Sequence, residues 1–117
     1  MSTTPDFIEF VNEQLRMFPN RRYRKMFGEY IFYINDKPVL LICDNTVYVK
    51  ILPEIADLMQ NATKKLPYEG TKEHYVLDIE DTELSAKVIT ILESITPLPK
   101  PRKRTKNSPS ANAKGDA

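Results

Sequence analysis

Four short runs of β-forming residues follow one another between residues 22 and 51, separated by only two to four residues. The connections at 28–29, 35–38 and 44–45 are rich in Gly, Asn, Asp and Pro, which favour tight turns. Parallel neighbours would need a crossover of about a dozen residues, for which there is no room. The spacing therefore predicts an antiparallel meander with strands at 22–27, 30–35, 39–43 and 46–51.

Helical patterns flank these runs. Thr4 is suited to the N-cap of a helix over about 5–18, in which apolar side chains recur every three or four residues. A second helix is expected from Leu52 or Pro53 to about 61, and Asp81 can cap a third to about 95. A loop at 64–70 and a strand at 74–79 lie between them. The order predicts an α+β fold, α-β4-α-β-α, in which three helices flank the meander sheet.

Two of the predicted strands are apolar on both faces. Residues 30–34 and 39–42 read Tyr-Ile-Phe-Tyr-Ile and Val-Leu-Leu-Ile, whereas a meander with one wet face alternates apolar and polar side chains. Helices on both sides of the sheet would provide the cover. Alternatively, one face is shared with a second subunit or a ligand. The pattern leaves both interpretations open.

Charge is distributed unevenly along the 117 residues, although the net charge is only +1. Residues 1–98 have a balance of −4 and residues 99–117 a balance of +5. All eleven Phe and Tyr lie at or before Tyr75, so the last segment has too little apolar surface to offset about 1–2 kcal/mol of backbone entropy per residue. We expect one domain over 1–98 and a disordered basic tail over 99–117.

Two basic clusters are candidate nucleic-acid contacts. The tail cluster consists of Lys100, Arg102, Lys103, Arg104 and Lys106, and the strand cluster of Arg22, Arg24 and Lys25. Because side chains alternate along a strand, Arg22 and Arg24 are expected on one side and Lys25 on the other. Such cations attract phosphates without reading sequence, and Tyr23 is placed to stack on a base. The competing interpretations are a tail that is solubilising or folds back on the acidic body, and a strand edge protected by charge.

Residues for catalysis or metal binding are sparse. A single cysteine, Cys43, permits no internal disulfide and indicates a reducing cytoplasm, and one Cys with one His (His74) cannot form a zinc site. The acidic residues at 78–83 are better explained by capping of the last helix. No apolar run approaches the roughly 18 residues that span a bilayer. We therefore expect no enzyme, cofactor, metal or membrane contact.

The stretch 24–30, Arg-Lys-Met-Phe-Gly-Glu-Tyr, resembles the signature of the TfoX N-terminal domain family, which is associated with regulators of natural competence. The resemblance extends over about 5–100, and its motif residues are Met26, Phe27, Gly28, Tyr30 and Lys50. It implies a secretion-chaperone-like α+β fold and no established active site. Full-length competence regulators of this kind carry a second helical domain, so the resemblance implies a fold more than a role in competence.

Together these features predict a non-enzymatic regulatory or binding module. We expect it to self-associate as a homodimer and to attract DNA or RNA through its basic tail. The alternative is an adaptor that binds a protein partner and makes no nucleic-acid contact.

Overall fold

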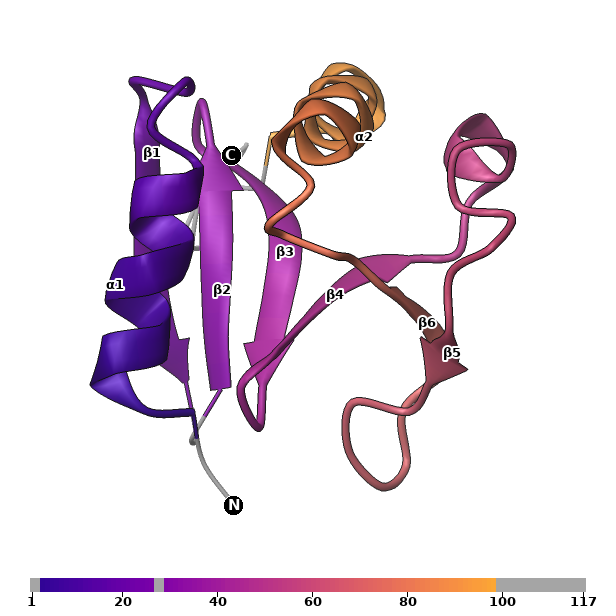
Figure 1. Cartoon of the computed structure of the whole chain (residues 1–117), viewed down its shortest axis with the longest axis horizontal. Coiled ribbons are helices and arrows are strands. Elements are labelled where there is room, and N and C mark those ends of the chain that lie inside the picture. The colour runs from indigo at the N-terminus through magenta and orange to yellow at the C-terminus, as the bar shows by residue number, and fades with distance from the viewer. Residues whose placement is uncertain (1–2, 27–28, 99–117) are drawn as a thin grey trace, which may run out of the picture.

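The computed structural model describes residues 3–26 and 29–98 (Figure 1). It confirms an α+β fold, in which a six-stranded antiparallel sheet has the order β1-β2-β3-β4-β6-β5. In chain order the elements are α1 (Pro5–Gln14), β1 (Arg21–Met26), β2 (Glu29–Ile34), β3 (Lys37–Cys43), β4 (Thr46–Lys50), η1 (Pro53–Ile55), β5 (Lys64–Lys65), β6 (His74–Val76) and α2 (Thr82–Ile95).

The predicted meander is confirmed, and turn chemistry accounts for two of its connections. Asn35 and Asp36 have φ values of 51° and 66°, and Asp44 and Asn45 have values of 54° and 55°. Asn and Asp tolerate this left-handed region better than other side chains, and consecutive positive φ values match the twist of paired strands. Gly28, expected to shape the first connection, lies outside the described residues, as does Phe27.

The first helix begins as predicted and ends earlier. The Thr4 side chain accepts a hydrogen bond from the backbone N–H of Phe7 at 3.3 Å, and Pro5 occupies the first helical position. The helix ends at Gln14 rather than near residue 18, and the N–H of Phe18 bonds instead to the carbonyl of Leu15. Because Pro19 disfavours the helical conformation at the preceding residue, the last turn tightens and stops.

The predicted second helix is wrong in type and length. Only Pro53–Ile55 forms a helix, a single 3₁₀ turn, and turns continue to residue 61. Leu52 at the N-cap provides no side-chain acceptor, so a nine-residue segment lacks a contact that would offset helix nucleation. The apolar pattern of residues 53–61 still indicates which side chains are buried, because Ile55 and Met59 lie in the core. The described residues thus contain two α-helices, not the three expected.

The region before the last helix also differs from expectation. The predicted loop contains a two-residue strand, β5, which pairs with β6, and β6 ends at Val76 rather than residue 79. Beyond it the N–H of Leu77 still bonds to the carbonyl of Val47 at 2.9 Å. The Asp78 carboxylate then accepts from the N–H of Glu80 at 3.2 Å, and this local bond replaces the sheet ladder.

The last helix forms as predicted, and Asp81 caps its N-terminus. The Asp81 carboxylate accepts from the N–H of Leu84 at 3.1 Å. Asp81→Ala is expected to lower the free energy of unfolding by about 1 kcal/mol, measured by urea denaturation, because the N-terminal turn loses a charged acceptor. Asp57→Ala, at an exposed turn position, is the matched control and should change it little. Equal losses in both variants would contradict the assigned role of the cap.

Both α-helices lie on the same face of the sheet, as a row of paired residues across β1, β2 and β3 shows. Arg21 pairs with Ile34, and Ile34 pairs with Lys37, so their side chains share a face. At one end Arg21 Nε lies 2.9 Å from the side-chain oxygen of Asn12 in α1, and at the other Lys37 Nζ lies 3.0 Å from the backbone oxygen of Glu93 in α2. We call this the helix-bearing face.

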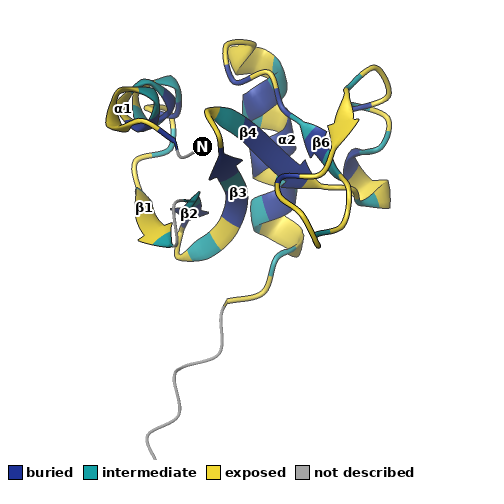
Figure 2. Ribbon diagram, turned by 90° about the horizontal axis from the view of Figure 1, so that it is seen from below, coloured by how far each residue is buried: buried dark blue, intermediate teal, exposed yellow. Residues whose placement is uncertain are grey.

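The core fills the space between the helix-bearing face and the two helices. Ile8 and Val11 of α1, Phe32 of β2 and Val88 and Ile89 of α2 belong to one buried cluster. Figure 2 shows the buried residues of β3, β4 and α2 gathered where these elements face one another. The opposite surface, the open face, has neither of the described α-helices on it and carries the side chains of Arg22, Arg24, Met26, Glu29, Ile31, Tyr33, Leu41, Cys43, Tyr48 and Lys50. Of these, Tyr33, Cys43 and Tyr48 are buried, so part of this face is already covered within the chain. Because both α-helices lie on the helix-bearing face, the expectation that helices cover both faces of the sheet is wrong for the described residues.

Candidate functional site

The strand cluster lies on an edge of the sheet. β1 pairs only with β2 among the described strands, and Arg22, Arg24 and Lys25 are exposed along it. Arg22 Nε lies 3.2 Å from the Asp36 carboxylate, and its guanidinium carbon lies 4.2 Å from the Tyr33 ring centre. This stacking holds Arg22 against the open face while most of its charge stays in water.

The alternation of β1 separates its cations, as the sequence predicts. Arg22 and Arg24 point to the open face, whereas Tyr23 and Lys25 are on the side of α1. Tyr23 is less available for base stacking than the sequence indicates, because its ring centre lies 5.1 Å from that of Phe32 and its hydroxyl donates to Glu9 at 3.4 Å. Burial, followed by the Glu9 carboxylate, raises the pKa of Tyr23. Its ring therefore packs against the domain on one side and stays 39% exposed.

Of the remaining predicted site residues, the tail cluster lies outside the described residues and most of the family-motif residues lie within them. The tail cluster, Lys100, Arg102, Lys103, Arg104 and Lys106, lies outside the described residues. Of the motif residues, Tyr30 is buried on the helix-bearing face, while Met26 and Lys50 line a groove on the open face. The motif therefore contributes to both surfaces of the sheet.

The groove of about 370 Å³ is the feature that sequence reasoning missed. β3 and β4 pair through only three residue pairs, ending at Leu41 and Tyr48, and then diverge (Figure 1). The groove extends from Met26 and Glu29 over the half-buried Ile31 into this divergence, and reaches Thr96 after α2. Strand divergence depends on tertiary packing, so no local pattern signals it. Only the two-sided apolar runs indicate an uncovered surface.

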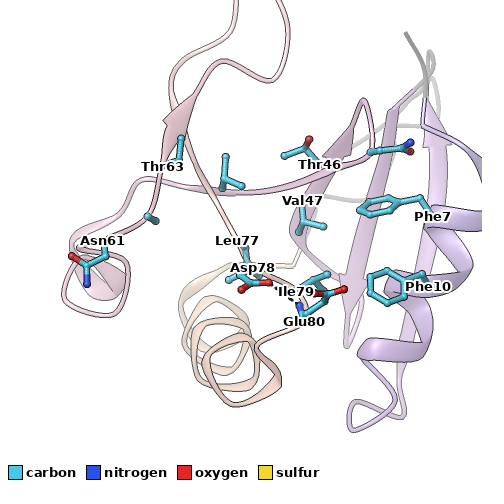
Figure 3. A pocket seen from close by; sticks show the side chains of 13 residues that line it. Phe7, Phe10, Thr46, Val47, Asn61, Thr63, Leu77, Asp78, Ile79 and Glu80 are labelled. Carbon is cyan, nitrogen blue, oxygen red and sulfur yellow. Dashed lines mark hydrogen bonds between the residues drawn. The ribbon is translucent and has the colours of Figure 1, made fainter.

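A second, more open cavity of about 470 Å³ lies between α1 and the segment 61–63 (Figure 3). The rings of Phe7 and Phe10 form one wall, Val47 and Leu77 contribute to its apolar lining, and the acidic lining residues come from the chain before α2. Asp78 and Glu80 bring two carboxylates to this cavity, and no Lys or Arg lines it. Since phosphates are repelled by carboxylates, this side of the molecule does not suit nucleic acid.

Cys43 and His74 show no catalytic arrangement. Burial raises the pKa of the Cys43 thiol, and the carboxylates of Glu29 and Asp44 raise it further. The His74 Nδ1 lies 2.8 Å from the carbonyl oxygen of Lys72, and its ring meets Tyr48 edge-on at 6.3 Å. Within residues 3–26 and 29–98, no three His, Cys, Asp or Glu side chains gather as a metal site.

The raised thiol pKa predicts low reactivity of Cys43 at neutral pH. Raising the pKa lowers the thiolate fraction at pH 7, and burial restricts access, so iodoacetamide should modify the folded protein at least about tenfold more slowly than the urea-unfolded protein. The rate should rise as the pH approaches the shifted pKa. Mass spectrometry of timed aliquots measures both rates, and equal rates in the two states would contradict the buried placement.

Fold and site define a small α+β domain with helices on one face of its sheet, a basic edge strand and an open-face groove. The model of the TfoX N-terminal domain matches residues 13–86, and the chain belongs to this family. The chain is 30% identical, over 95% of its own length and 98% of the other's, to an uncharacterized 12.7 kDa protein encoded in the trpE 5′ region of Spirochaeta aurantia. No solved structure matches.

Membership of this family supports a regulatory module in general terms, and the family is not a known enzyme family. Within the described residues, neither α1 nor α2 is long and apolar enough to cross a bilayer.

Proposed function

We propose that the protein is a non-enzymatic, cytoplasmic regulatory module that self-associates and is drawn to nucleic acid through two basic elements. The elements are the β1 edge and the tail cluster that follows the domain. Each attracts phosphates without reading base sequence. The family is associated with the regulation of competence, and this proposal does not depend on such a role.

The observation that carries the proposal is the exposed basic edge of an otherwise acidic domain. Residues 1–98 have a charge balance of −4, yet β1 presents Arg22, Arg24 and Lys25 within four residues on a strand edge. Neither Arg24 nor Lys25 belongs to any ion pair found within the described part of the chain. Cations without carboxylate partners can exchange counterions for phosphates at little cost.

The alternative candidate is an adaptor of secretion-chaperone-like fold that binds a protein partner without contacting nucleic acid, and the groove is the observation that favours it. Its lining includes the exposed side chains of Pro38 and Tyr68, the latter at 46% exposure. A polar-rimmed apolar groove is typical of a protein contact. A protein contact at the groove does not account for the basic β1 edge, so we favour nucleic acid as the target of these cations.

Neutralising the two unpaired cations of β1 tests the role of this edge. Arg24→Gln with Lys25→Gln is expected to reduce the slope of log affinity against log salt by about 1.8 on duplex DNA, because each lost phosphate contact removes about 0.9. Lys65→Gln with Lys72→Gln removes the same charge from exposed positions elsewhere that also lie outside the ion pairs of the described residues, and is the matched control. Fluorescence anisotropy over a salt series measures the slopes. An equal slope change in both double variants would show that only net charge matters.

A further inference from the structure

We propose that the open-face groove is the surface through which two copies of this chain associate, related by a two-fold axis. The inference rests on the proposed function, which includes self-association, and adds where the contact lies and what it does. The groove, its apolar rim and the charges at its ends each bear on the identity of the occupant.

The described domain covers the groove only in part. Tyr48 and, from α2, Leu92 line it and are buried, whereas Ile31 and Leu41, also in the lining, stay half-buried on the open face. An apolar floor of this kind, rimmed by polar groups, loses water favourably only when a partner closes it. The groove is therefore an interaction surface rather than part of the folded core.

The edges of the sheet are unsuited to pairing between copies. β1 presents Arg22, Arg24 and Lys25, and the other edge strand, β5, consists of Lys64 and Lys65, both exposed. Two copies joined edge to edge would place like charges opposite one another, which is destabilising and is a common protection against such pairing. Self-association is therefore directed to a face of the molecule.

The rim of the groove offers side chains that a second copy can bury. Pro38, Lys50 and Tyr68 line the groove and are exposed, Tyr68 to 46%. In a two-fold contact each copy supplies the same rim and the same groove, so the apolar side chains of each copy enter the groove of the other. This reciprocity doubles the buried apolar area.

Charge at the two ends of the groove is self-complementary. Glu29 lines one end and Lys50 the other, and neither forms an ion pair in the part of the chain that the structure describes. Burial raises the pKa of Glu29, so its carboxylate is held in a poorly solvated position without a cation. A two-fold axis across the groove brings Glu29 of each copy to Lys50 of the other. A partner of single-sign charge would satisfy only one of them.

The contact has a consequence for nucleic-acid attraction. Thr96, which follows α2, lines the groove, so each chain leaves the described domain at this surface. A dimer across the groove then starts two basic segments at one interface, ten cations in place of five. Linking two weak electrostatic contacts in this way raises the overall affinity without any new type of contact.

Sedimentation velocity over a concentration series tests the surface. Wild-type protein is expected to pass from the mass of one chain to that of two. Tyr68→Glu, at an exposed position that does not endanger folding, should raise the dimer dissociation constant at least about tenfold, and Leu41→Glu should do the same. Met17→Glu is the matched control, because Met17 is 43% exposed but does not line the groove, and it should leave the constant unchanged.

A charge exchange makes the test specific to the two-fold arrangement. Glu29→Lys and Lys50→Glu should each weaken the dimer, and the double variant should restore it. A dimer insensitive to Tyr68→Glu and Leu41→Glu would overturn the groove assignment and leave self-association standing. A wild-type monomer at every concentration would overturn both, and binding of an apolar dye lost in Leu41→Glu would then identify a small ligand as the occupant.

Discussion

Phe32→Ala is expected to lower the free energy of unfolding by about 3–5 kcal/mol, whereas Ile31→Ala, one residue earlier on the same strand, should lower it by about 1 kcal/mol. Phe32 is fully buried on the helix-bearing face, and its loss leaves a cavity that the core cannot refill. Ile31 is half-buried on the open face, so only part of its side chain leaves water on folding. Domains of this size have only about 5–15 kcal/mol of stability, so the first loss is a large share of the total.

Urea denaturation measures the free energy of unfolding of both variants, which should be compared in a monomeric protein. Tyr68→Glu should be present in each, because a dimer closed over the open face would bury Ile31 further and increase the cost of truncating it. In that monomeric background the two substitutions should differ by at least about 2 kcal/mol. Equal costs would contradict the assignment of one packed face and one open face.

Much of the fold could be predicted because its determinants are local. Asn and Asp at the two described hairpin turns adopt the left-handed conformation that the sequence indicates, and Thr4 and Asp81 cap the two α-helices as expected. The family was also identified from the sequence, since the motif at 24–30 lies within the matched range 13–86. Short-range chemistry of this kind leaves its signal in adjacent residues.

The errors arose where tertiary contacts decide the conformation. Residues 53–61 carry a helical apolar pattern, yet Ile55 and Met59 reach the core from a 3₁₀ turn and further turns. β5 consists of two lysines with no strand-like pattern and exists because β6 pairs with them. Propensity is a weak prior when a segment is this short, so packing overrides it.

The candidate site was predicted in part. The sequence places Arg22 and Arg24 on one side of their strand and Lys25 on the other, and the pairing of β1 with β2 agrees. The groove was not foreseen, because it depends on the divergence of β3 from β4 after Leu41 and Tyr48. The tail cluster at 100–106, the disorder of 99–117 and the domain limit at 98 stay predictions, since they concern residues outside those that the structure describes.

Removing the charge of the tail cluster should have the largest effect on nucleic-acid affinity. With Lys100, Arg102, Lys103, Arg104 and Lys106 all changed to Gln, the slope of log affinity against log salt on duplex DNA should fall in magnitude by about 4–5. At 0.1 M salt the affinity should fall roughly a hundredfold or more, because counterion release supplies most of non-specific binding. A variant with residues 99–117 in shuffled order retains the charge and should bind like the wild type, since phosphate contacts do not read sequence.

Anisotropy titration of duplex DNA over a salt series, comparing wild-type protein with the five-fold Gln variant and a 1–98 truncation, tests the central claim most directly. We expect the two altered proteins to share one shallow slope, set by the β1 edge alone, and the wild type to show a much steeper one. Identical affinities and slopes for all three proteins would contradict the claim that a cationic segment draws this domain to nucleic acid.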